Sequence, residues 1–127
     1  MKHEELTRKI IGAAMEVHKH LGNGFQEVIY QRALSIELNL QGIAHEREKE
    51  MHIQYKGCEI GTRRVDFFVE DVIMVEIKAI INLEDVHLAQ SINYLEAYNK
   101  EVGLLINFGA KSLQYKRVHN NNCLNLD

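Results

Sequence analysis

The sequence predicts an α+β (mixed α/β) fold in which two helices precede three strands, one helix and two final strands. Apolar residues recur every three or four positions as far as Leu40, as they do along the buried side of a helix. The period then shortens to about two, which is typical of half-buried strands, and it lengthens again once before the last two strands. The 127 residues have the length of one ordinary domain, so we expect a single domain over residues 1–127. The order ααβββαββ predicts a central mixed sheet of about five strands flanked by helices.

The helices are predicted from apolar spacing together with signals at their ends. Gly22 stands where a left-handed cap would end the first helix, and Gly42 follows the second. Asn82 is the expected N-cap of the third helix, with Asp85 three residues later as an imperfect capping box. The expected helices cover residues 4–21, 25–40 and 83–99.

The strands are predicted from apolar runs, alternating or continuous, that turn signals separate. Lys56-Gly57 is typical of a hairpin turn, and Glu70-Asp71 is a polar break. The expected strands cover residues 45–55, 58–69, 72–79, 102–108 and 113–118. The helix between the third and fourth strands can serve as a crossover, which is expected to be right-handed. The polar tail at 120–127 is expected to be frayed.

Composition narrows the classes of function. No apolar run approaches the roughly 20 residues of a membrane span, and the N-terminus lacks the apolar core of a signal peptide. Cys58 and Cys123 form no motif, and we expect reduced thiols in a cytoplasmic protein without a membrane partner. The net charge of −3 does not point to nucleic-acid binding. It does not exclude such binding either, because the carboxylates of a site subtract from a local basic face.

Two acidic residues interrupt strands that are otherwise apolar. Asp66 is flanked by valine and phenylalanine, and Glu76 by valine and isoleucine. An unpaired buried charge costs several kcal/mol or neutralises itself, so each acid requires compensation. Side chains alternate along a strand, which places Glu76 and Lys78 on one face.

The register between these two strands decides whether the acids meet. Alternation places Asp66 on the same face of its strand as Arg64 and Phe68. A two-residue turn would put Asp66 opposite a valine, whereas a three-residue loop at 70–72 puts it opposite Glu76. We predict the three-residue register, or a bulge with the same effect.

The compensation that this pattern predicts is a divalent cation. Oxygen ligands suit Mg²⁺ or Mn²⁺, and the backbone carbonyl of Ile77 is a natural further ligand beside Asp66 and Glu76. Lys78 could orient a water molecule or stabilise negative charge that develops on a phosphate. The alternative is a plain ion pair at a solvated sheet edge, either Glu76 with Lys78 or Asp66 with Arg64.

Helical residues supply further candidates for the same site. Glu27 and Tyr30 lie three positions apart, on one face of the second helix, and Gly24 one turn earlier could permit close approach of a ligand or a strand. Gln90 lies within the third helix. Each has an ordinary alternative: the helix dipole favours an acid such as Glu27 near a helix start, and Gln90 could be a surface amide.

A particular set of residues carries a resemblance to a known family. In chain order they are Gly24-x-x-Glu27-x-x-Tyr30, Asp66, Glu76-x-Lys78 and Gln90. This set resembles the GxxExxY family, which belongs to the PD-(D/E)XK nuclease-like superfamily. The resemblance extends over roughly residues 5–119, and Val65 stands where the superfamily's name has proline.

The resemblance implies a restriction-endonuclease-like core and a set of roles. It implies that Asp66 and Glu76 are metal ligands and that Lys78 is the catalytic lysine. Glu27 matches the acidic residue of the first core helix, and Gln90 matches the glutamine often found in the following helix. We therefore expect a nuclease that uses Mg²⁺ or Mn²⁺ and acts on nucleic acid, with DNA as the first expectation.

Other interpretations and partners stay open. One alternative is a catalytically silent module that binds nucleic acid or a partner protein, and another is a structural dimer subunit in which Glu76 and Lys78 form a plain ion pair far from Glu27. A homodimer could form through an apolar edge at 104–108 or through the first helix. Candidate phosphate contacts are Lys19, Arg63, Arg64, Lys111, Lys116 and Arg117.

Overall fold

A computed structural model describes residues 3–122, and within them the elements follow the predicted order ααβββαββ. The helices and strands are α1 (Glu4–Leu21), α2 (Glu27–Leu40), β1 (His45–Tyr55), β2 (Cys58–Val69), β3 (Ile73–Lys78), α3 (Asp85–Ala97), β4 (Val102–Asn107) and β5 (Gln114–His119). None of these helices combines the length and the apolar character that a crossing of the bilayer requires.

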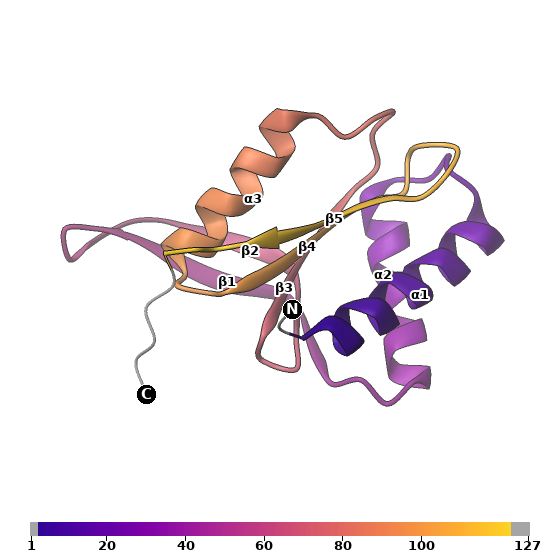
Figure 1. Ribbon diagram of the computed structural model, residues 1–127, viewed down its shortest axis with the longest axis horizontal. Helices are drawn as coiled ribbons and strands as arrows, with labels where there is room; N and C mark the ends of the chain where they lie inside the picture. Colours follow the sequence, from indigo (N-terminus) through magenta and orange to yellow (C-terminus); the bar gives the residue numbers. More distant parts are fainter. Residues whose placement is uncertain (1–2, 123–127) are drawn as a thin grey trace.

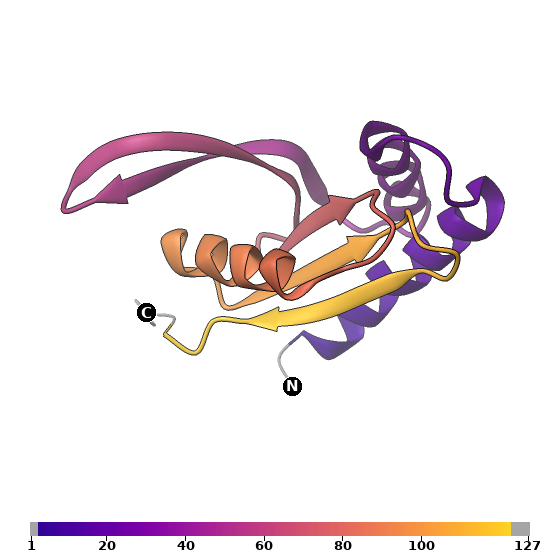
Figure 2. The ribbon, with the colours of Figure 1, turned by 90° about the horizontal axis from the view of Figure 1, so that it is seen from above.

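The strands form one mixed sheet in the order β1-β2-β3-β4-β5 (Figure 1). Neighbouring strands are antiparallel except β3 and β4, which are parallel and are joined by α3 as the predicted crossover. β1 and β2 are about twice as long as the other strands, and their hairpin projects beyond the rest of the sheet (Figure 2). The predicted fold class is therefore confirmed.

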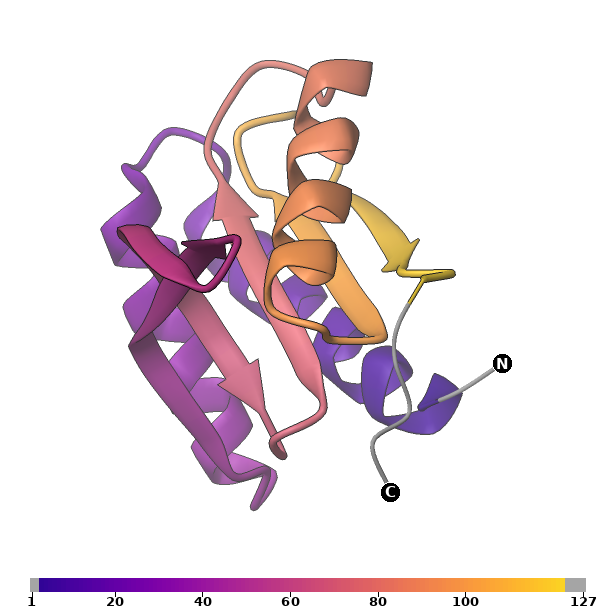
Figure 3. The ribbon, with the colours of Figure 1, turned by 90° about the vertical axis from the view of Figure 1, so that its left-hand side faces the viewer.

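The helices cover both faces of the sheet. α1 and α2 lie behind it and α3 lies in front in Figure 3. The larger apolar cluster, on the α1–α2 side, includes Ile73, Val75 and Ile77 of β3, whereas Met74 packs with Leu95 of α3 in the smaller cluster. Since side chains alternate along β3, the two residues that continue the Met74 face, at 76 and 78, lie on the α3 side.

The register between β2 and β3 is the predicted one. Val69 pairs with Ile73, so the loop has three residues, and the pairing continues as far as Phe67 opposite Val75. Beyond that pair the ladder stops, so β2 and β3 diverge. Asp66 is the first residue of β2 past this fork.

The expected alternation along β2 is wrong around Asp66. Val65 and Phe68 both pack in the smaller cluster on the α3 side, although strict alternation would separate them. The β1–β2 ladder omits the pair of Glu48 with Asp66, and Glu48 has a positive φ of 55°. This local distortion shifts the alternation by one residue, so that Arg63, two residues before Val65, shares the α3 side.

Two further expectations are corrected by side-chain contacts. Asn82 is not the N-cap of α3, because its amide oxygen accepts a hydrogen bond from Gln114, and Glu84 is the N-cap instead. Asn120 is not frayed: it is 5% exposed and its side chain donates to the carbonyls of Leu95 and Lys100. The rest of the polar tail from residue 123, with Cys123, lies outside the described residues.

The apolar stretch at 104–108 is not an edge. β4 lies between β3 and β5, and all of its residues are buried. A dimer interface along this stretch is therefore excluded, because its backbone and side chains are already committed to the sheet and the cores.

Candidate active site

Asp66 lies at the fork with its carboxylate between the layers. One oxygen, Oδ2, accepts a hydrogen bond of 2.7 Å from the backbone N–H of Ile77, in the gap that opens between β2 and β3. The other, Oδ1, accepts a bond of 2.9 Å from the side chain of Gln31 on α2. The carboxylate is thus fixed by one strand and one helix, and each oxygen keeps a further lone pair for another partner.

Glu76 approaches the same point from β3 and is 3% exposed. Its Oε2 accepts a bond of 2.9 Å from the guanidinium of Arg63. Its Oε1 is buried and has no hydrogen-bond partner within residues 3–122. The alternative interpretation, an ion pair of Glu76 with Lys78, is not formed within residues 3–122, and Arg63 is the counter-ion instead.

Burial and charge together raise the pKa of Glu76 to about 7. Desolvation is the largest cause, and the negative charge of the nearby Asp66 carboxylate raises the pKa of Glu76 further. Arg63 opposes both effects without cancelling them. The two carboxylates therefore lie close enough to interact directly, as the sequence predicted.

Lys78 and the carbonyl of Ile77 complete this end of β3. Lys78 is half-buried on the face of Glu76, and its ammonium makes no ion pair with any described residue. In a strand, the N–H and C=O of one residue point to the same side. Because the Ile77 N–H points to Asp66, the Ile77 carbonyl faces the same gap between β2 and β3.

Glu27 is the first residue of α2 and stands at the rim of this site. Its pKa is raised by partial desolvation and then by the negative charge of Asp66, while Lys78 and Arg63 act in the opposite direction. Glu27 is therefore electrostatically coupled to the site. This contradicts the interpretation in which the acids of β2 and β3 lie far from it.

Tyr30 holds the loop that precedes α2 and leads into Glu27. Its ring is fully buried and stacks on Phe108 with 4.6 Å between the ring centroids. Its hydroxyl donates to the Gly22 carbonyl at 2.7 Å and accepts from the Phe25 N–H at 3.1 Å. The expected helix start at 25 is wrong, because Gln26 has an extended backbone (φ −79°, ψ 159°) and is the N-cap, so that α2 begins at Glu27.

Gly24 has no steric requirement for glycine. A Cβ added there would meet nothing within 4 Å, whereas Gly22 has a φ of +75° that favours glycine. The expected close approach of a strand to Gly24 is thus wrong, and the glycine leaves open space before the helix.

A family model described as "PD-(D/E)XK nuclease superfamily" matches residues 4–118. The chain belongs to the PD-(D/E)XK nuclease superfamily. The crystal structure of SSO0001 is similar in fold, with 19% identity and a TM-score of 0.59, over 94% of this chain and 60% of that one. The chain thus spans less than two thirds of that structure, and no curated protein matches it.

The carboxylate pair agrees with the divalent metals that nucleases of this superfamily generally use. Within residues 3–122 no three side chains of the histidine, cysteine and acid types converge as a metal-binding group. An ion here would instead have two carboxylates, Asp66 and Glu76, with the Ile77 carbonyl and water. Such a set suits Mg²⁺, which retains several waters. The buried, unpartnered Glu76 Oε1 agrees with this assignment.

Gln90 and the basic candidates are less well gathered. Gln90 is exposed and its side chain makes no hydrogen bond within the described part of the chain, although it lies one turn before Tyr94, which contacts Arg63. Lys116 and Arg117 are consecutive in β5 and point to opposite faces, and Arg117 donates to Thr7 of α1. The exposed residues Lys19, Arg64 and Lys111 belong to three different elements or loops. These side chains form no single basic stripe.

Sequence reasoning missed Gln31 and Asn107. Gln31 follows Glu27 by one helical turn, and a polar residue beside the buried face of α2 was its only signal. Asn107 is fully buried and binds both the N–H and the C=O of Ile80, with Gln114 as a further partner. An asparagine at the end of an apolar strand could have indicated this clamp, which fixes the segment after Lys78.

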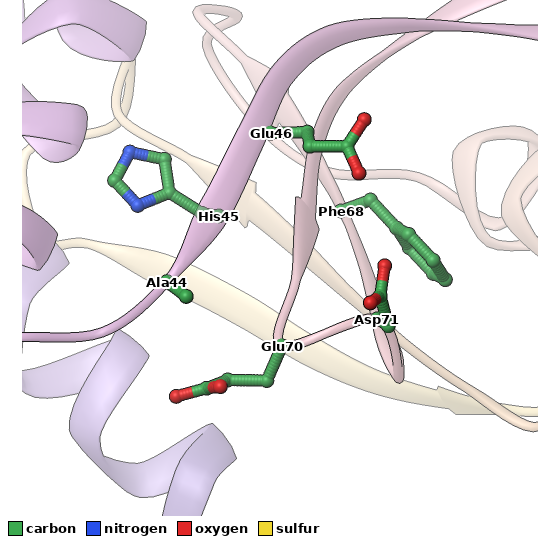
Figure 4. A pocket seen from close by; sticks show the side chains of 6 residues that line it. All are labelled: Ala44, His45, Glu46, Phe68, Glu70 and Asp71. Atoms are coloured by element: carbon green, nitrogen blue, oxygen red, sulfur yellow. The ribbon is translucent and has the colours of Figure 1, made fainter.

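A shallow cavity of about 220 Å³ lies elsewhere, at the turn end of β3. Figure 4 shows its lining, which is Ala44, His45, Glu46, Phe68, Glu70 and Asp71. The ring of His45 and the carboxylate of Glu70 point away from those of Glu46 and Asp71. These polar groups do not converge on one point. The cavity is distinct from the carboxylate pair, because neither Asp66 nor Glu76 lines it.

Proposed function

We propose that this chain hydrolyses phosphodiester bonds of nucleic acid, DNA in the first instance, with one Mg²⁺ or Mn²⁺ held by Asp66, Glu76 and the Ile77 carbonyl. The observation that carries the proposal is the meeting of two carboxylates at the β2–β3 fork, where the Oε1 of Glu76 is buried without a hydrogen-bond partner in the part of the chain that the structure describes. The chemistry that the ion would supply is polarisation of a phosphate oxygen and of a bound water.

The side chains of this protein would divide the remaining work. Lys78 would position the attacking water and offset negative charge as phosphorus becomes five-coordinate. Glu27, whose pKa is raised, suits proton transfer from that water more than tight metal ligation. Gln90 would orient Lys78 or a water when substrate is present. Gln31 and the Ile77 N–H hold Asp66 in place throughout.

The test is cleavage of plasmid and branched DNA with Mg²⁺ or Mn²⁺. We expect the wild-type protein to cleave and the Lys78→Ala variant to lose this activity. The control variant is Lys9→Ala, which also removes a lysine, here an exposed one that pairs with Glu5 on α1, and it should keep the activity. Wild type that cuts no nucleic acid, or a Lys78→Ala variant as active as wild type, would contradict the proposal.

A silent binding module is the second candidate, because the net charge is −3 and Arg63 is engaged with Glu76. A module of this kind needs no metal. Mn²⁺ binding that disappears in the double variant Asp66→Ala with Glu76→Ala favours the hydrolase.

We further propose that a homodimer, if it forms, uses the exposed side of α1, where Met15 is 47% exposed. Analytical ultracentrifugation of Met15→Glu tests that interface.

A further inference from the structure

Arg63 is held between two partners on the α3 side of the sheet. Its terminal nitrogen lies 2.9 Å from Oε2 of Glu76, and the centre of its guanidinium lies 4.0 Å from the ring centroid of Tyr94. The Glu76 side chain is 5% exposed, whereas that of Arg63 is 28% exposed. A terminal nitrogen is thus bound to the acid and Nε is buried, while the Arg63 side chain as a whole keeps partial access to solvent.

The ion pair leaves several polar atoms unsatisfied. Arg63 contacts Glu76 through one nitrogen, although arginine and carboxylate often pair through two parallel bonds. Nε of Arg63, Oε1 of Glu76 and the hydroxyl of Tyr98 are buried without a hydrogen-bond partner within residues 3–122. Tyr98 feels the charges of both Arg63 and Glu76, so these atoms belong to one neighbourhood. The protein therefore holds Arg63 at Glu76 with fewer bonds than the pair can make.

A divalent cation on Glu76 and Asp66 would compete with this arrangement. The cation and the guanidinium would share one carboxylate, and two positive groups so close repel each other strongly in a poorly hydrated site. Arg63 has an alternative position, because the Tyr94 ring retains a cation through its face and the side chain already reaches solvent.

We propose that Arg63 is a resident counter-ion that a divalent cation displaces from Glu76, and that the released guanidinium then binds a substrate phosphate. This inference rests on the proposed function, since it requires a cation at Asp66 and Glu76. A guanidinium matches the geometry of phosphate oxygens better than an ammonium does. Arg63 also belongs to the same strand as Asp66, three residues earlier, so a phosphate that reaches the carboxylate pair passes beside it. Cation binding and phosphate binding are then coupled through one side chain.

Arg64 is the matched control. It is the next residue of β2, it is exposed, and it pairs across the hairpin with Glu50, whereas Arg63 is paired with Met51. It therefore faces away from Glu76 and carries the same charge on the adjacent residue of the same strand.

The experiment measures Mn²⁺ binding to the full chain by calorimetry at pH 8.5, where protons compete little with the metal. We expect Arg63→Gln to bind Mn²⁺ roughly 10-fold more tightly than wild type, and Arg64→Gln to bind as wild type does. A short phosphorothioate duplex, which resists cleavage, should tighten Mn²⁺ binding in wild type and not in Arg63→Gln, because binding linkage is reciprocal.

The outcomes separate this inference from the proposed function. No Mn²⁺ binding in wild type, or binding that survives Asp66→Ala with Glu76→Ala, overturns both. Binding at those acids that is unchanged or weaker in Arg63→Gln overturns the displacement and leaves the hydrolase proposal standing. If Arg63→Gln does not fold, NMR of the wild-type arginine Nε–H groups decides. The Arg63 signal, assigned by its loss in Arg63→Lys, must shift on Mg²⁺ addition while that of Arg64 stays, and an unmoved Arg63 signal at saturating Mg²⁺ overturns the proposal.

Discussion

Replacing Glu76 by glutamine should make the stability of the metal-free protein less dependent on pH. The folded protein raises the pKa of Glu76 from 4.5 to about 7, chiefly because the side chain is buried. The folded state therefore binds the proton more tightly than the unfolded state does. The stabilisation from this proton is complete below pH 4.5, declines between 4.5 and 7, and is lost once the pH has risen past 7.

The size of the effect follows from that pKa. Each tenfold change in proton affinity corresponds to about 1.4 kcal/mol, so a rise from 4.5 to about 7 corresponds to about 3 kcal/mol of unfolding free energy. Glutamine has the shape of the protonated acid and cannot ionise. Between pH 4.5 and pH 8, the free energy of unfolding of the Glu76→Gln variant should therefore rise by up to about 3 kcal/mol relative to that of wild type.

The assay is urea unfolding at several pH values in the presence of EDTA, for wild type, Glu76→Gln and Glu70→Gln. Glu70 is an exposed residue of the loop between β2 and β3, so its replacement controls for the removal of one charge. The difference in unfolding free energy between each variant and wild type is taken at each pH, which cancels the contributions of the other titrating groups. If the unfolding free energies of wild type and Glu76→Gln run parallel across this pH range, the burial argument for Glu76 is refuted.

Three other changes test the parts that position the site. Tyr30→Phe removes two hydrogen bonds from the loop before α2 and should lower the free energy of urea unfolding by about 1–2 kcal/mol. An unchanged free energy of unfolding would show that these bonds do not stabilise the loop. Gly109→Ala should lower the melting temperature, because its Cβ would lie 2.4 Å from the backbone after β3, whereas Gly24→Ala should leave it unchanged; equal melting temperatures would contradict this. Gln31→Leu leaves Asp66 without one donor and should weaken Mn²⁺ binding by about tenfold or more, and an unchanged affinity would deny it a positioning role.

The sequence was sufficient to predict the fold order and the register at the site. Register was predictable because Asp66 and Glu76 are costly inside apolar strands, and a loop at 70–72 is the arrangement that brings them together. Local patterns carry this kind of information, since loop length and strand period are properties of neighbouring residues.

The partner of Glu76 could not be predicted from the same rules. Strict alternation places Arg64 beside Asp66, and it gives no reason to choose Arg63 for Glu76. The structure selects Arg63 because β1 is distorted at Glu48, which shifts the faces of β2 by one residue. That distortion depends on how the two paired strands of the β1–β2 hairpin fit each other in the sheet, and the period of a single strand cannot express it.

Gln31 and Asn107 were missed for a related reason. Each satisfies polar groups that become buried when separate segments come together, Asp66 for Gln31 and the Ile80 backbone for Asn107. An amide reveals such a role through its partners, and those partners are 35 and 27 residues away in the chain. The spacing of residues along the sequence does not predict contacts between residues so far apart in the chain.

Glu76 is the point at which stability and proposed function diverge. The protein buries this carboxylate and gives it one arginine bond, and the second oxygen has no hydrogen-bond partner among residues 3–122. An apolar residue between Val75 and Ile77 would remove that cost, and the neighbouring core shows that this protein fills such positions readily. Glu76 lies at the fork between β2 and β3, and the ammonium of Lys78, two residues later, makes no ion pair within residues 3–122, and both features support the proposed cation site. The coupling through Arg63 then explains how the same acid is tolerated before that cation arrives.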